Sequence, residues 1–241
     1  MDQTRRFLVP GQNRLLSSLS RDLQVRLLPR LEKVSLAVRQ TVQEADAPVG
    51  YVWFPLSGVV SVVLSLKNGA TVEIATVGSE GLVGTAAVLG AERSPLSAFC
   101  QVAGQATRMR ADLFRRSLQE FPELSAVVHR YIQALLNQTA QSIACNHAHS
   151  VEQRIARWLL MTHDRVGADE FQLTQEFLAQ MLGVRRPSVT VAACELQKQG
   201  LIRYQRGRIR IVERAGLEAR SCECYEKVRG ELDRLIGING M

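Results

Sequence analysis

Residues 173–202 read LTQEFLAQMLGVRRPSVTVAACELQKQGLI and fit two short helices joined by a tight turn. Thr174 precedes the first apolar run, where its hydroxyl can accept a hydrogen bond from a free backbone amide at the helix start. Gly183 ends that run at a position that needs left-handed backbone geometry, which glycine adopts without a steric penalty. Pro187 opens the second run, where its missing N–H is not needed. This spacing predicts a helix-turn-helix, whose second helix fits the major groove of DNA.

Positive charge gathers in and just after this segment. The chain has 241 residues with 30 basic and 23 acidic side chains, a formal charge of +7 at pH 7. Between Arg185 and Arg210, seven basic side chains oppose a single acidic one, so six of the seven net charges lie within 26 residues. Such a concentration beside a helix-turn-helix favours binding to the phosphate backbone of DNA. A solvated basic face on an ordinary helical subdomain is the alternative.

Seven side chains are therefore predicted to contact DNA. Two arginines stand at the start of the second helix, the end that normally faces the base edges, and two hydroxyl side chains follow in its first turns. The sequence RYQRGRIRIV then predicts a basic hairpin with Gly207 at its tip, a wing that contacts the phosphate backbone. With the capping threonine, the predicted contacts are Thr174, Arg185, Arg186, Ser188, Thr190, Arg206 and Arg208.

The N-terminal half has a different pattern, from about residue 34 to residue 110. Short valine-rich runs such as YVWFPLSGVVSVVLSL and TVEIATV are separated by Gly, Pro, Asn and Ser. Asn68-Gly69, between two of these runs, predicts a β-hairpin with a type I′ turn. Many short strands with regular turn residues indicate a sandwich or a barrel-like roll.

Composition places the chain among globular proteins of a reducing compartment. Hydrophobic residues make up 46% and charged residues 22%, which excludes a disordered chain. No apolar run approaches the ~18 residues of a membrane helix, and the N-terminus lacks the apolar core of a signal peptide. We therefore expect no membrane partner and a cytoplasmic location. The five cysteines are an odd number and are expected to be free thiols.

A long helix is predicted from residue 123 to residue 149, without an internal Gly or Pro. Its side chains repeat at alternating steps of four and three residues, which is the seam of a coiled coil. The same seam fits two arrangements, a core helix that covers the roll and a dimer helix that pairs with a second chain. Length and the 3.5-residue period favour the dimer. The predicted dimer contacts are Leu124, Val128, Tyr131, Leu135, Gln138 and Ser142.

Two groups of residues with metal-ligand side chains remain outside these patterns. Cys145, His147 and His149 follow one another at the end of the long helix, and Cys145 shares a helix face with His149. Cys222 and Cys224 lie in a C-terminal extension whose amphipathic pattern predicts an added helix. Polar packing at a helix end and free cysteines are the preferred interpretations of the two groups, so we predict no metal and no cofactor.

Taken in order, the roll, the long helix, the segment VEQRIARWLL, the helix-turn-helix and the basic wing resemble the Crp/Fnr transcription regulators over about residues 12–212. The resemblance implies an α+β fold with an N-terminal β-roll of the double-stranded β-helix or jelly-roll type, a long dimerisation helix and a C-terminal winged helix-turn-helix. The corresponding domains are residues 1–122, 123–149 and 150–241. It also implies a homodimer on a palindromic operator, an effector at or near the roll, and RNA polymerase as a partner.

Motifs of the roll determine which effector the resemblance implies. In the cyclic-nucleotide-binding members, a Gly-Glu pair contacts the ribose, an Arg-Ser pair holds the cyclic phosphate, and the long helix contacts the adenine. Because Thr85 stands where a glutamate is expected, and a threonine accepts two ribose hydroxyls less well, cyclic AMP is not the expected effector. Glu80 and Gly81 offer a second alignment. The positions that match the pocket are Gly84, Thr85, Arg93, Ser94 and Thr139.

An enzyme, an iron–sulfur regulator and a binding module without DNA affinity are the alternatives to this regulator. Rolls of this type also house metal-dependent enzymes of the cupin type, whose ligands are histidines on strands. All four histidines here fall in predicted helices, and the roll has no paired carboxylates, nucleophile elbow or phosphate loop. The iron–sulfur members of the Crp/Fnr family need N-terminal cysteines, whereas the first cysteine here is Cys100. We expect no enzymatic activity; a binding module without specific DNA affinity is the remaining alternative.

Overall fold

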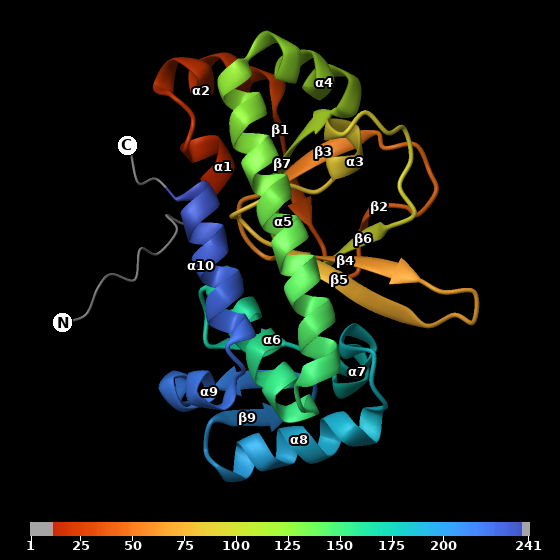
Figure 1. Ribbon diagram of the computed structural model, residues 1–241, viewed down its shortest axis with the longest axis vertical. Coiled ribbons are helices and arrows are strands. Elements are labelled where there is room, and N and C mark those ends of the chain that lie inside the picture. The colour runs from red at the N-terminus through yellow and green to blue at the C-terminus, as the bar shows by residue number, and fades with distance from the viewer. Residues whose placement is uncertain (1–11, 238–241) are drawn as a thin grey trace, which may run out of the picture.

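The N-terminal half of the chain folds into a roll of two antiparallel sheets, in a computed structural model that describes residues 12–237. One sheet has the strand order β1-β7-β3 and the other the order β2-β6-β4-β5. This architecture confirms the predicted β-roll (Figure 1). The strands are β1 (Glu32–Leu36), β2 (Thr41–Gln43), β3 (Tyr51–Pro55), β4 (Val59–Ser65), β5 (Thr71–Val77), β6 (Ser97–Val102) and β7 (Gly104–Arg110).

The hairpin between β4 and β5 lies where Asn68-Gly69 predicted it, but its turn is not of the expected type. Only Gly69 has a positive φ, 82°, whereas a type I′ turn requires positive φ at two successive residues. The Asn68 side chain instead accepts a hydrogen bond from the backbone N–H of Ala70 at 3.0 Å, as asparagine does in many turns. The prediction of a hairpin is confirmed, and the prediction of the turn type is wrong.

Short helices close the ends of the roll. The leucine-rich N-terminal segment forms two helices that pack on the core. Asn13 begins the first of them and is 2% exposed, and its side-chain amide donates to the carbonyls of Pro55 at 2.9 Å and Gly81 at 2.8 Å. The helices are α1 (Arg14–Ser17), α2 (Arg21–Leu27), the 3-10 turn Leu28–Arg30, α3 (Thr85–Val88) and α4 (Ala111–Glu120).

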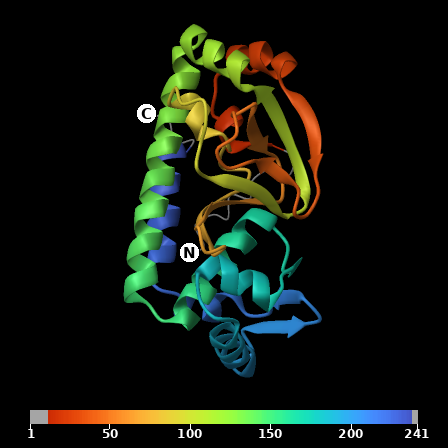
Figure 2. The ribbon, with the colours of Figure 1, turned by 90° about the vertical axis from the view of Figure 1, so that its right-hand side faces the viewer.

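One uninterrupted helix, α5 (Pro122–Ala148), runs from the roll to the C-terminal domain (Figure 2). Pro122 stands in its first turn, where a proline is tolerated because its N–H would have no helical partner. The helix α10 (Cys224–Ile236) lies beside α5 in Figure 1 and runs in the opposite direction. Hydrogen bonds from Gln141 to Cys224 and from Asn137 to Glu231 join the two helices.

The C-terminal domain is a winged helix-turn-helix, as predicted, and forms most of a second apolar core. Gly183 has φ 62° and ends the first helix of the motif, and the core includes Leu178, Val189 and Leu196. None of the helices within residues 12–237 is both long and apolar enough to cross a membrane. The elements are α6 (Val151–Val166), β8 (Glu170–Gln172), α7 (Gln175–Leu182), α8 (Arg186–Lys198), β9 (Ile202–Gln205), β10 (Arg208–Ile211) and α9 (Arg214–Arg220).

Candidate DNA-binding and effector sites

Helix α8 lies at the end of the molecule away from the roll (Figure 1), with basic side chains at its start. Arg185 is the N-cap residue of α8, and Arg185, Arg186 and Ser188 are exposed. The nearest carboxylate to Arg186 is that of Glu176, with 4.0 Å between Nε and Oε2, and both side chains are more than half exposed. An exposed ion pair of this length contributes little stability, so the Arg186 guanidinium is free to contact another anion.

The wing, residues 202–211, stands next to the start of α7. Arg206 and Gly207 have φ 48° and 74°, so the wing closes with the two-residue turn of positive φ that type I′ hairpins use. The N–H of Leu173 donates to the carbonyl of Gly207 at 2.8 Å, which holds the tip beside Thr174. Arg206 and Arg208 are exposed, and within residues 12–237 Arg208 has one ion pair, to Glu170 at 3.4 Å. Both guanidinium groups are therefore accessible.

Two of the predicted contacts also have bonds within the domain. The hydroxyl of Thr174 accepts from the N–H of Phe177 at 3.1 Å, which is the predicted N-cap bond. The hydroxyl of Thr190 lies 2.7 Å from Gln175 Oε1, so its proton is used in joining α8 to α7. One surface position was absent from the predicted contacts: Val191 is 71% exposed on α8. An exposed apolar side chain on such a helix can contact the methyl group of thymine. The sequence alone did not show which face of α8 is exposed.

The five residues predicted for the effector pocket have local bonding roles. Gly84 has φ 101° and precedes α3, and a Cβ there would meet the Tyr51 carbonyl oxygen at 2.8 Å. Thr85 is the first residue of α3. Arg93 is exposed and donates to the carbonyl of Asp46 at 2.6 Å. The buried Ser94 hydroxyl accepts from the N–H of Leu96, and the Thr139 hydroxyl donates to the Leu135 carbonyl within α5.

A small hollow lies between β5 and helices α5, α6 and α7, and none of these five residues lines it. Its wall includes Glu73, Gln138, Ser142, Arg157 and Trp158. The space has a volume of about 20 Å³, which suits a single water molecule. A nucleotide-sized ligand does not fit there in this conformation.

The predicted dimer seam of α5 faces inward. Leu124, Val128, Tyr131 and Gln138 are at most 5% exposed. The Tyr131 hydroxyl donates to the Leu82 carbonyl at 3.1 Å, and the Gln138 amide donates to the Thr76 carbonyl at 3.3 Å, so both side chains hold the roll. Leu135 packs at the edge of the same core, and the Ser142 hydroxyl accepts from Arg157. The structure thus differs from the predicted dimer seam. These side chains pack against the roll, as in the alternative in which α5 covers the roll.

The roll and the DNA-binding domain are joined through buried charged groups. Glu80, from the loop after β5, forms an ion pair with Arg165 of α6 at 2.8 Å, and both side chains are at most 8% exposed. Glu73 on β5 accepts a hydrogen bond from the indole N–H of Trp158 at 2.6 Å, and burial raises the pKa of its carboxyl to about 7. Glu80 therefore contacts the DNA-binding domain, and its second alignment as a ribose ligand is not supported by this geometry.

The two separate groups of cysteine and histidine meet in space. Cys145 and His149 lie beside Cys222 and Cys224, although 73 or more residues separate them along the chain. His147 is exposed and outside this cluster. The sequence predicted no metal for either group taken alone. Because α10 lies along α5, the two groups instead form one cluster of metal-ligand side chains.

Comparison with known protein families identifies both halves of the chain. Residues 33–121 match the cyclic nucleotide-binding domain, and residues 153–220 match the Crp-like helix-turn-helix domain. The chain belongs to the Crp/Fnr family. Its members are transcription regulators that bind DNA and are not enzymes, so this Crp/Fnr protein is a regulator with a helix-turn-helix domain and a domain of the cyclic nucleotide-binding type.

Individual relatives are similar to most of the chain. A Mycobacterium tuberculosis protein described as a CRP-like cAMP-activated global transcriptional regulator is 25% identical over 186 residues, which cover 74% of this Crp/Fnr chain and 83% of the relative. The structure of FixK2 from Bradyrhizobium japonicum has a TM-score of 0.67 at 15% identity, and covers 80% of this chain and 98% of its own. The c-di-GMP responsive regulator CLP of Xanthomonas campestris has a TM-score of 0.66 at 17% identity, with coverage of 80% and 99%. The two structures establish the shared fold.

Proposed function

We propose that this Crp/Fnr regulator binds a palindromic operator as a homodimer and that its DNA affinity is set by an effector at or near the roll. The observation that carries the proposal is the exposed group of arginines at the start of α8 and on the wing. We propose domains at residues 1–122, 123–149 and 150–241, which agree with the bounds of α5 to within one residue.

Sequence reading is assigned to the exposed face of α8. Arg186, at the first position of the helix, suits a bidentate bond to guanine O6 and N7. Val191 follows on the bare face and suits a thymine methyl group. Arg206 and Arg208 on the wing suit phosphate contacts, which position the protein without reading sequence. The operator half-site is therefore expected to contain a guanine and a thymine in neighbouring positions.

The dimer contact is assigned to the outward face of α5. Leu136 and Ile143 are 59% and 67% exposed and lie seven residues apart, the heptad spacing of a helix-to-helix contact. The buried seam residues cannot reach a partner, whereas these two can. The two α8 helices of such a dimer would enter half-sites about one turn of DNA apart.

The effector remains outside the cyclic AMP class in this proposal. Although the mycobacterial relative is cAMP-activated by its description, Thr85 replaces the glutamate expected to hold the ribose. We place the effector within reach of the segment 78–94, which includes α3, and propose that its binding alters the Glu80–Arg165 contact. RNA polymerase is the expected partner of the DNA-bound form.

The test combines DNA selection with a binding titration. Operator sequences selected from random duplex DNA by the purified protein are expected to be palindromic, and binding should weaken steeply as salt rises because counterions are released. Selected DNA without two-fold symmetry, or binding that does not depend on salt, would contradict the proposal. Isothermal titration with cyclic AMP is expected to give no heat of binding, and micromolar affinity would overturn the view of the effector.

A further inference from the structure

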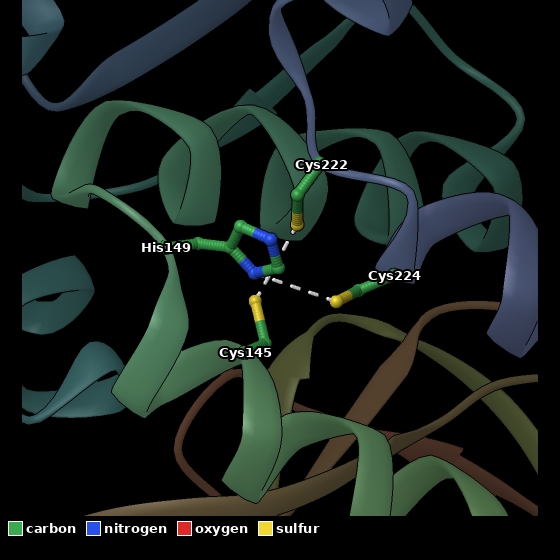
Figure 3. Close-up of side chains that lie close together, drawn as sticks. All are labelled: Cys145, His149, Cys222 and Cys224. Atoms are coloured by element: carbon green, nitrogen blue, oxygen red, sulfur yellow. Dashed lines mark hydrogen bonds between the residues drawn. The ribbon is translucent and has the colours of Figure 1, made fainter.

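A cluster of four metal-ligand side chains lies where the long helix, the DNA-binding domain and the C-terminal helix meet (Figure 3). Cys145 comes from the last turn of α5, His149 is the residue that ends α5, and Cys222 and Cys224 come from the start of α10 and the turn before it. The three cysteines are at most 3% exposed. The ligand atoms all lie within 4.8 Å of one another.

The distances within this cysteine–histidine cluster match a single tetrahedral ion. Cys145 Sγ lies 3.5 Å from Cys222 Sγ, and Cys224 Sγ lies 3.6 Å from His149 Nδ1. Zinc bonds of about 2.3 Å to sulfur and about 2.0 Å to nitrogen give a tetrahedron with edges of roughly 3.5–3.8 Å. An iron–sulfur cluster distributes its four ligands over two or more iron atoms, so ligands on different irons lie further apart than the 4.8 Å that spans this cluster.

Groups around the cluster orient the ligands as metal sites require. His149 Nε2 lies 3.2 Å from Glu223 Oε2, so the N–H at Nε2 donates to the carboxylate and leaves Nδ1 facing the sulfurs. A carboxylate on the far nitrogen of a histidine ligand is the usual support in zinc proteins. The side-chain amide of Gln141 donates to Cys224 Sγ at 3.0 Å, which stabilises a thiolate.

Two buried arginines place positive charge beside the cluster, where it would balance the negative charge of a metal complex. Three thiolates, one neutral imidazole and Zn²⁺ together carry one negative charge. Arg154 and Arg157 of α6 are each 7% exposed, and their charges act on the sulfurs of the cluster. Arg154 Nε, Arg157 Nε and Arg157 Nη1 lack hydrogen-bond partners among the described residues. Buried cations without full pairing are costly, so a negative metal complex beside them lowers that cost.

We propose that Cys145, His149, Cys222 and Cys224 bind one Zn²⁺ ion, which fastens the start of α10 to the junction between α5 and α6. All four ligands come from the protein, so the site is closed to substrate and its role is structural. Because His149 is the last residue before α6 is capped, the ion also fixes how the DNA-binding domain leaves α5. This second consequence, for DNA affinity, rests on the proposed function.

Metal analysis of the purified chain tests the site directly. Protein prepared with a thiol reductant and without chelator is expected to hold about one zinc per chain by elemental mass spectrometry. Cys145→Ser and Cys222→Ser are expected to lose it, whereas Cys194→Ser, which alters an exposed cysteine outside the cluster, should keep it. Zinc no higher than in the Cys222→Ser variant, iron with acid-labile sulfide, or a Cys145–Cys222 disulfide in the reduced preparation would each overturn the proposal.

A second measurement remains decisive if the cysteine variants fail to fold. Co²⁺ added to chelator-treated wild-type protein is expected to give the strong visible bands of tetrahedral cobalt and the ultraviolet band of cobalt–thiolate bonds. Glu223→Gln should weaken metal affinity by ~10–100-fold, as is typical when support to a ligand is lost. Glu226→Gln, which alters an exposed carboxylate on the first turn of α10, should leave affinity unchanged. Octahedral cobalt spectra without thiolate bands would contradict the site.

DNA titrations separate the site from the proposed function. Chelator-treated protein is expected to bind its selected operator at least several-fold more weakly than the same protein reloaded with zinc. Equal affinities would overturn the consequence for DNA binding. Protein that holds zinc but binds no DNA at all would instead refute the proposed function and leave the metal site standing.

Discussion

Glu80 Oε1 and Arg165 Nε lie 2.8 Å apart, in an ion pair that connects the roll to the first helix of the DNA-binding domain. The Glu80 side chain is 7% exposed and that of Arg165 is 8% exposed, so neither charge is solvated. Glu80 also accepts from the N–H of Gly78 at 3.0 Å, and Arg165 donates to the carbonyls of Met161 and Thr76. An effector that moves the backbone around Glu80 must therefore move or break a contact to α6.

Arg165→Met is expected to lower the free energy of unfolding by about 3–5 kcal/mol, because it leaves the buried Glu80 carboxylate without a cationic partner. Adding Glu80→Gln should restore part of the loss, since the second change removes the stranded charge. Urea unfolding measures both effects. Arg110→Met breaks an exposed pair with Asp112 and serves as the control, with little expected change. A double variant no more stable than Arg165→Met would contradict this account.

Stability should fall as pH rises through the range set by Glu73. Burial raises the pKa of Glu73 to about 7 in the folded state from 4.5, so between these values the folded chain holds a proton that the unfolded chain has lost. The free energy of unfolding therefore decreases from about pH 4.5 to about pH 7. Glu73→Gln keeps an acceptor for Trp158 and removes the titration, which should reduce the drop between pH 5 and 8 by ~2 kcal/mol. Parallel urea profiles for variant and wild type would refute this expectation.

Arg186→Ala should remove specific DNA binding and spare nonspecific binding. Loss of a bidentate contact to guanine costs ~1–3 kcal/mol, and the preference for one base at that operator position should disappear with it. Fluorescence anisotropy with the selected operator and single-base variants measures the change. Arg116→Ala removes an exposed arginine from α4 in the roll and should have no effect on the base preference. An unchanged preference in Arg186→Ala would rule out the assigned contact.

Arg206→Ala and Arg208→Ala should weaken binding to every sequence by a similar factor. A phosphate contact releases about one counterion, so each variant should reduce the slope of log affinity against log salt by ~1. The salt series is measured on the selected operator and on unrelated duplex DNA. If either variant changed base preference and left the slope unaltered, the wing would be reading bases instead.

Leu136→Glu and Ile143→Glu should convert the protein to monomers. Each places a charge on the outward face of α5, where the proposed partner helix must lie, and neither side chain is part of the chain's own core. Analytical ultracentrifugation gives the molecular mass in solution. Val25→Glu, on a residue of α2 that is 64% exposed, is the matched control and should remain dimeric. Dimers in both α5 variants would move the interface elsewhere.

Local patterns in this sequence predicted local structure well. The helix-turn-helix followed from a capping threonine, a turn glycine and a first-turn proline within 14 residues, and each acts on the backbone next to it. The cysteine–histidine cluster was missed because it depends on α10 folding back along α5, which no short spacing encodes. The seam of α5 was assigned to the wrong partner for a related reason. A heptad pattern states that one face is buried, but it is the same whether that face meets a roll or a second chain.

The connection between α5 and α6 consists of His149 and Ser150 alone. Each residue has two soft dihedral angles, and Ser150 is already fixed by reciprocal hydrogen bonds with Gln153 at the start of α6. Within this covalent connection, the remaining rotational freedom is thus concentrated in the backbone of His149, while the Glu80–Arg165 pair restrains the two halves through space. In the proposed dimer, the distance between the two α8 helices would follow in part from the backbone angles of His149, so a residue far from any DNA contact would help to set the operator spacing.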